Sequence, residues 1–366
     1  MCRLTHARLV TTASSFDPRT RVLALSRSLV ALAQLVVLAV SPDRTLFAYR
    51  PDLPDGMRCD GVRRLTLWCV SGPSPDGMTC ARVVAITVLL AAAIGCVPRW
   101  VCVPHWFVTA SFNASLTQPI GGDAAATVLT LLVIPMLIAD RRVWHWSTPV
   151  AELPPVWRGS GYAAWLVLRL QIALIYVDAA VSKSANPGWR SGRAMYSVFT
   201  DPYTGLAGPF RKAAEPILSS GVAIHALTWG VLVTEFAIAG CMLGSRRARK
   251  TAVVLAVLLH SGIAVLMGLV GFGLTMIALV GLGSGGRREH LGQKIAAGLG
   301  GTDFQMQGRA VEVEAEVEER AALLLGDGQH GNRGGAVGRE GQPQALGDRR
   351  AGCADEGDAP LVRTLT

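Results

Sequence analysis

Charged residues are scarce in this sequence. They make up 17% of its 366 residues, whereas 51% are hydrophobic and the mean hydropathy is +0.37. Soluble domains carry about 25% charged residues, so this composition indicates a membrane protein whose first partner is the lipid bilayer. The formal net charge is +9, but the basic residues lie between apolar runs and do not alternate with aromatic residues. We therefore expect no nucleic-acid partner and interpret these charges as loop charges that orient helices.

Paired cysteine motifs are also missing. None of the eight cysteines forms a CxxC pair, which argues against zinc-ribbon and thioredoxin chemistry, and we expect no metal site. Cys59, Cys69 and Cys80 fall in one loop. A disulfide, with Cys59 and Cys69 as its candidates, is one interpretation if that loop faces an oxidising compartment, and free thiols are the other.

Lysine is rare among the 35 basic residues. Only Lys183, Lys212, Lys250 and Lys294 are lysines, and the arginine bias is typical of GC-rich coding. An amine can lose its proton when it is desolvated, whereas a guanidinium cannot. Lys183 is therefore a candidate for a function specific to an amine, and chance retention is the alternative.

The sequence predicts an all-α protein, a polytopic transmembrane helix bundle of about six spans with a disordered C-terminal tail. We divide it into a polar N-terminus (1–21), a transmembrane domain (22–283) and a low-complexity tail (284–366). A frameshifted reading of GC-rich DNA is a second explanation of the tail. The expected apolar spans are 22–40, 81–97, 123 or 124 to 139, 159–182, 221–244 and 251–283.

Two of these spans and one connection need comment. We interpret 22–40 as a retained helix and not a signal peptide, because it is long and Pro42 follows it. The run 251–283 is too long for one perpendicular span, so we expect a tilted helix or a break near Gly268, Gly271 and Gly273. Between the second and third spans, Trp100 to Phe107 are interpreted as an interfacial aromatic belt.

The chain is organised around residues 171–200. An apolar helix carries Lys183 at its end, where Asn186, Pro187 and Gly188 prevent its continuation. Trp189 follows at the expected lipid boundary. Gly192 and Tyr196 then belong to a second, shallower amphipathic segment.

Ionisable residues inside the spans are functional candidates, because charge at membrane depth is costly. Arg169, Tyr176 and Lys183 are spaced by seven and share one side of their helix. Glu235 and His260 lie midway along two later spans, so they can meet Lys183 inside the bundle. In one interpretation Lys183 is a catalytic base or nucleophile with Glu235 or His260 as its partner. In the other, Lys183 reaches the interface and Glu235 pairs with Arg169.

These residues carry a resemblance to a known family. Lys183, Trp189, Gly192, 194–196, Glu235 and His260 resemble the horizontally transferred transmembrane (HTTM) domain, which vitamin K-dependent γ-carboxylases share with many bacterial membrane proteins. The stretches PRWVCVPHWFVTASFNASLTQPIGGDAAATVLTLLVIPM and DRRVWHW are more similar to the sporulation-delaying protein B (SdpB) branch. The resemblance covers roughly residues 20 to 283.

The resemblance implies several properties. The SdpB branch implies a multi-pass protein of the bacterial cell membrane that helps to produce, mature or export a secreted antimicrobial peptide. Its partners would then be a peptide toxin precursor and a co-encoded accessory protein. In the carboxylases the lysine that matches Lys183 is the base linked to vitamin K epoxidation, which implies a quinone-linked enzyme as a second hypothesis. A non-catalytic transporter or scaffold is the third.

The membrane orientation is left open by the sequence. Basic residues are found on both sides of the expected spans, so the positive-inside rule gives no preference. A disulfide between Cys59 and Cys69 favours an inside N-terminus, whereas the basic cluster at 246–250 favours the reverse.

Overall fold

A computed structural model describes residues 12–47, 56–117 and 121–285. The last 81 residues of the expected tail, from 286 onward, lie outside this range, as does most of the polar N-terminus. Within the described ranges the chain forms helices and one isolated β-bridge, between Cys96 and Trp144, and no strand. The all-α prediction is therefore confirmed for this part of the chain.

Five of the described helices are long and apolar enough to cross a membrane. They are α2 (Arg21–Val40), α5 (Pro75–Ile94), α8 (Pro155–Ala185), α13 (Gly221–Leu243) and α14 (Arg246–Leu266). Two shorter apolar helices are α7 (Gly121–Leu137) and α15 (Val270–Ser284). The chain is a multi-pass helical membrane bundle.

Short helices occupy the connections between these long ones. They are α3 (Asp43–Leu46), η1 (Gly61–Leu65), α4 (Leu67–Ser71), α9 (Pro187–Arg190), α10 (Ala194–Thr200), α11 (Gly208–Ala213) and α12 (Glu215–Leu218).

Side-chain caps and prolines set the ends of the long helices. Ser74, Ser220 and Ser245 each accept a hydrogen bond from a backbone N–H in the first turn of α5, α13 and α14. This satisfies a donor that has no partner within the helix. The helix α8 stops at Ala185, because Pro187 excludes the residue before it from helical geometry.

The long apolar run 251–283 is broken, as the glycines in it predicted. The helix α14 ends at Leu266 and α15 begins at Val270. Gly268 lies between them with φ +72°, a conformation that strongly favours glycine. The two helices then pack against each other along their length.

The segment interpreted as an aromatic belt, Trp100 to Phe107, forms a helix that the sequence did not predict. These residues lie in an 18-residue helix, α6 (Pro98–Ser115), which packs between α5 and α7. The polar residues of this helix are typical of a surface segment, but His105 and Thr109 are buried in the bundle. His105 is 2% exposed, and Thr109 is fully buried and donates a hydrogen bond to Gln34. The sequence pattern of α6 is that of a helix whose polar side chains are satisfied by neighbouring helices.

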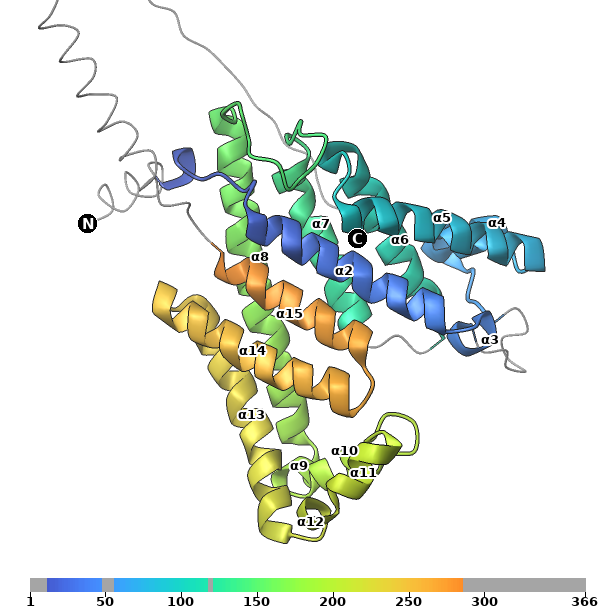
Figure 1. Cartoon of the computed structure of the whole chain (residues 1–366), viewed down its shortest axis with the longest axis vertical. Coiled ribbons are helices and arrows are strands. Elements are labelled where there is room, and N and C mark those ends of the chain that lie inside the picture. The colour runs from blue at the N-terminus through green and yellow to red at the C-terminus, as the bar shows by residue number, and fades with distance from the viewer. Residues whose placement is uncertain (1–11, 48–55, 118–120, 286–366) are drawn as a thin grey trace, which may run out of the picture. The chain divides into compact units, whose positions relative to one another are not determined.

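Helices from opposite parts of the chain form the centre of the bundle. Figure 1 shows α2 and α15 side by side, and α15 also contacts α7, α8 and α14. The close approach depends on glycine at one point, because a Cβ on Gly283 would lie 2.5 Å from both Ile172 and Met242. The longest helix, α8, runs beside α13.

The described bundle has two ends, named here for the groups they carry. At the N-terminal end the start of α2 meets the segment between α7 and α8, where Arg19 donates to the Ala151 carbonyl. At the lysine end the segment after Lys183 meets the break between α14 and α15, where the Ala207 N–H donates to the Leu266 carbonyl. The candidate site lies toward the lysine end.

Candidate functional site

Lys183 and Glu235 form an ion pair between α8 and α13. The Lys183 Nζ lies 2.6 Å from the Glu235 Oε1. The Glu235 side chain is 9% exposed and the Lys183 side chain 29%. The ammonium also lies 5.6 Å from the centre of the Trp189 ring, within the range of a cation–π interaction. The end of α8, its stop and the following tryptophan together fix the position of this amine.

The alternative pairing of Glu235 with Arg169 is wrong. Arg169 donates to the Met242 carbonyl through Nη2 at 2.7 Å, and its guanidinium lies 4.8 Å from the Trp165 ring centre. Its role is to join the first half of α8 to the end of α13. Arg169 belongs to the same stripe as Lys183 in sequence but not to the same site.

Tyr176 and His260 form a second polar pair, between α8 and α14. The Tyr176 hydroxyl lies 2.7 Å from the His260 Nε2, and both side chains are buried. The His260 ring also contacts Phe272 of α15 edge-on, with ring centres 5.3 Å apart. Tyr176 lies two turns before Lys183 on α8, so the seven-residue spacing places both side chains on the same side of the bundle interior.

The two pairs line one cavity of about 440 Å³. Its wall also contains Asp178 and other residues of α8, residues from the first half of α7, and Phe272 and Met276 of α15. The Oε2 of Glu235 and the Nδ1 of His260 are buried and have no hydrogen-bond partner among the described residues. Such atoms are available to a ligand.

Gly192 and Tyr196, the remaining residues of the predicted motif, are not in the cavity wall. Gly192 has φ +72°, and a Cβ there would lie 2.3 Å from the His225 ring, so the turn after α9 requires glycine. Tyr196 lies on α10 and is 51% exposed, outside the cavity wall.

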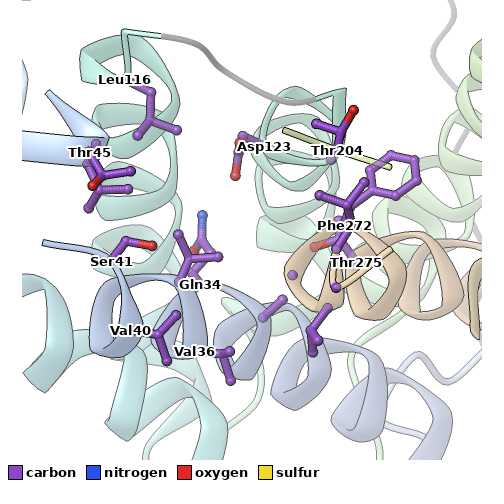
Figure 2. Close-up of a pocket in the computed structure, with 18 of the residues that line it drawn as sticks. Gln34, Val36, Val40, Ser41, Thr45, Leu116, Asp123, Thr204, Phe272 and Thr275 are labelled. Carbon is purple, nitrogen blue, oxygen red and sulfur yellow. The ribbon is translucent and has the colours of Figure 1, made fainter. Parts of the chain in front are cut away.

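A larger cavity of about 760 Å³ lies next to this one (Figure 2). It is bounded by the end of α2, the segment with Thr45, the start of α7 and the start of α15, and Phe272 lines both cavities. Its wall is mainly aliphatic, with Asp123 as the ionisable residue in it. The smaller cavity therefore holds more of the ionisable groups, among them Lys183, Glu235 and His260.

Cys59 and Cys69 form a disulfide beside η1 and α4 in this structure. Among the described residues, no group of three His, Cys, Asp or Glu side chains is placed to hold a metal ion.

Three polar residues are buried at the N-terminal end, and one of them, Arg27, was not singled out from the sequence. Arg27 of α2 is 4% exposed, and His105 and His145 are each 2% exposed. Burial, followed by the charges of Arg27 and Arg142, lowers the pKa of His145 to about 4. An arginine inside an apolar run is itself a signal of a membrane site, and it identifies Arg27.

The fold and the buried polar pairs define a class, a multi-pass helical membrane protein with ionisable groups facing an internal cavity. Two curated proteins of Bacillus subtilis (strain 168) are each 29% identical to the chain over 265 residues, or 72% of its length. They are the uncharacterized protein YitO, of which 85% is covered, and the sporulation-delaying protein SdpB, of which 81% is covered.

This similarity supports membership of the SdpB family. No protein-family model matches the chain, and no solved structure matches it.

Proposed function

We propose that this protein acts in the cell membrane to produce, mature or export a secreted antimicrobial peptide, and that Lys183 is the central acid–base group of its site. The similarity to a sporulation-delaying protein supports the first part. The cavity lined by the Lys183–Glu235 and Tyr176–His260 pairs supports the second. That cavity is the observation on which the proposed chemistry rests.

The Lys183–Glu235 pair is suited to moving a proton. The short contact between Nζ and Oε1 allows the ammonium to transfer a proton to the carboxylate, which leaves a neutral amine. In a site of low dielectric the neutral pair costs less desolvation energy than the ion pair does, so the two forms are closer in free energy than they are in water. The neutral amine is a base that can accept a proton from a bound substrate.

Tyr176 and His260 add a second pair with a different function. The hydroxyl and the imidazole each contain both donor and acceptor capacity, so a ligand in the cavity can be oriented by either. The unpartnered Nδ1 of His260 is the atom of this pair that remains for such a ligand. This arrangement resembles the base-and-orienter constellations of acid–base sites.

Lys183→Arg is the central test. Arginine keeps the positive charge and the pairing with Glu235 but does not provide a titratable amine. We expect the variant to be present in the membrane at a normal level and to abolish production of the active peptide, measured as killing of a sensitive strain by culture supernatant. The exposed Lys250→Arg is the matched control and should retain full activity.

The same activity measurement, with two further changes to the system, separates the other hypotheses. A transporter or scaffold should tolerate both Lys183→Arg and Glu235→Gln. A quinone-linked enzyme should lose activity when the membrane quinone is removed, whereas the proposed peptide function should not. Full activity of Lys183→Arg would contradict the acid–base role of Lys183 and leave the membrane role in peptide production to be judged by deletion of the whole protein.

A further inference from the structure

Asp178 is an exposed acidic residue inside the longest membrane-spanning helix, α8. It lies seven residues, or about 10 Å, before the end of that helix at Ala185. Among the described residues it has no hydrogen-bond or ion-pair partner. An ionisable residue at membrane depth is costly, and such residues mark substrate and ion sites by default. Asp178 therefore needs an explanation that the packing of the bundle does not supply.

Asp178 lies at the mouth of the Lys183 cavity. Three residues of the described wall are exposed, and they are Gly121 and Ala124 of α7 and Asp178 of α8. The other residues of that wall are buried or half-buried, so the cavity opens between α7 and α8. A ligand that enters there meets the Asp178 carboxylate before it reaches the buried Glu235.

The described wall carries an excess of negative charge. It contains two carboxylates, Asp178 and Glu235, and one ammonium, Lys183. The ammonium is bonded to Glu235 at 2.6 Å. Lys183 follows Asp178 by five residues, or about 140° around the helix, so it is not placed to neutralise Asp178 as well. In surroundings of low dielectric the unbalanced carboxylate attracts a cation strongly.

The rest of the wall fits an organic cation better than a metal ion. No group of three His, Cys, Asp or Glu side chains in the described part of the chain is placed to hold a metal. An alkyl stem, in contrast, can pack against the apolar side chains of the wall, among them Val128, Ile175 and Met276. The volume of about 440 Å³ falls in the range of sites for small organic ligands.

We propose that Asp178 binds a positively charged group of the substrate, a primary amine or a guanidinium, at the mouth of the Lys183 cavity. The bound group holds the neighbouring part of the substrate against the Lys183–Glu235 pair. Asp178 thus determines specificity and takes no part in proton transfer. The nature of the substrate rests on the proposed function: a peptide supplies such a group as a lysine, an arginine or its N-terminal amine.

A binding test needs no production of peptide. The purified full-length protein, in micelles of an uncharged detergent at pH 7.5, is titrated with N-acetyl-lysine amide or with N-acetyl-norleucine amide at constant ionic strength. The two probes differ in the side-chain ammonium. We expect the lysine probe to bind about tenfold or more tightly than the norleucine probe. At about ten times its Kd it should raise the Tm by about 3 °C or more.

Asp178→Asn should remove the preference for the lysine probe, because the amide keeps the shape of the side chain but not its charge. The native side chain has no partner among the described residues, so without a probe the variant should have a Tm equal to or above that of the native protein. Asp178→Glu keeps the carboxylate and should keep the preference.

Glu215→Gln is the matched control. Glu215 is also exposed and lies in the segment after Lys183, at the lysine end, but it is not in the cavity wall. The variant should bind both probes as the native protein does, which excludes a general effect of surface charge.

Equal binding of the two probes to the native protein would overturn the proposal, as would a preference that survives Asp178→Asn. These outcomes are separate from the activity of Lys183→Arg. A cation preference together with a fully active Lys183→Arg would contradict the acid–base role of Lys183 and support the cation site. No preference together with an inactive Lys183→Arg would contradict the cation site alone.

Discussion

Lys183 differs from the other described lysines in the atoms around it. Lys212 and Lys250 are exposed on short or terminal segments, whereas Lys183 contacts a buried carboxylate and an indole ring. Its partner Glu235 is buried midway along α13, where an unpaired carboxylate is costly. The two charges therefore depend on each other for stability as well as for chemistry.

Removing one charge of this pair should cost more than removing both. Lys183→Met leaves the buried Glu235 carboxylate alone, and we expect a loss of about 2 kcal/mol in the free energy of unfolding, reduced from the value for fully buried pairs because Lys183 is partly exposed. The double variant Lys183→Met, Glu235→Leu should recover most of that loss. Unfolding in detergent with increasing denaturant measures both.

Lys250→Met is the control for this double-mutant cycle and should change the stability little. The cycle is completed by the single variant Glu235→Leu. If the destabilisation of the double variant equals the sum of the two single ones, Lys183 and Glu235 are not energetically coupled.

His145 should make the N-terminal end sensitive to acid. Its pKa is about 4 in the folded protein and about 6.5 in the unfolded chain, so the unfolded state binds more protons between these values. Stability should therefore be unaffected above about pH 6.5 and fall by up to about 3 kcal/mol as the pH drops toward 4. The charges that face this ring are Arg27, Arg142 and Asp140.

Thermal unfolding of the native protein and of His145→Asn between pH 7.5 and pH 4.5 measures this effect. The variant should lose a smaller part of its stability over that interval. Parallel curves for the two proteins would show that other groups cause the acid sensitivity.

At the scale of elements, the break between α14 and α15 positions one wall of the Lys183 cavity. It turns the chain so that Phe272 of α15 contacts His260 of α14. An uninterrupted helix would carry residues 270–284 away from α2 and α7, which α15 contacts in the structure. One residue in left-handed geometry, Gly268, makes that reversal.

Gly268→Ala should destabilise the bundle by about 1 kcal/mol, because alanine is strained at a φ of +72°. The open space around this position means that the cost comes from the backbone alone. Gly262→Ala is the matched control, since that glycine also has open space around it but lies inside α14 with helical geometry. There alanine should stabilise by about 0.5 to 1 kcal/mol.

The two substitutions should thus change the thermal unfolding temperature in opposite directions. A Gly268→Ala protein as stable as the native one would mean that the break adopts another geometry in the membrane.

At the scale of the whole molecule, the structure links the disulfide to the lysine end. The Thr117 N–H donates to the Leu46 carbonyl, and Trp68 packs between Phe47 and Phe112, so the disulfide loop lies beside the ends of α2 and α6. Figure 2 shows Thr45 and Thr204 at one cavity, which places the segment after Lys183 at this same end.

Because disulfides persist in oxidising compartments, we predict that the lysine end faces the outside of the cell membrane. Tyr203→Cys lies at that end and Val150→Cys at the other, and both positions are almost fully exposed at 95% and 101%. In a background without the native free thiols, a membrane-impermeant maleimide should label Tyr203→Cys in intact cells and Val150→Cys only after lysis. The reverse labelling would place the N-terminal end outside.

The number and positions of most helices follow from the sequence. Apolar runs long enough for a bilayer predicted α2, α5, α8 and α13, because a helix satisfies its backbone hydrogen bonds within its own segment inside lipid. Proline and glycine predicted the end of α8 and the break after α14, since these residues restrict or release the backbone locally. The missed helix, α6, has polar residues whose partners lie on other segments, so its own sequence contains no sufficient signal.

The sequence by itself determined that this protein is a helical membrane bundle, where its main helices end, and that Lys183, Glu235 and His260 are unusual at membrane depth. Only the tertiary structure decided that Glu235 pairs with Lys183 and not with Arg169, and that His260 pairs with Tyr176. The periodicity of a helix fixes which of its residues share a side, but the rotation and depth of each helix against its neighbours come from packing. The pairing of charges on separate helices is therefore a property of the assembled bundle.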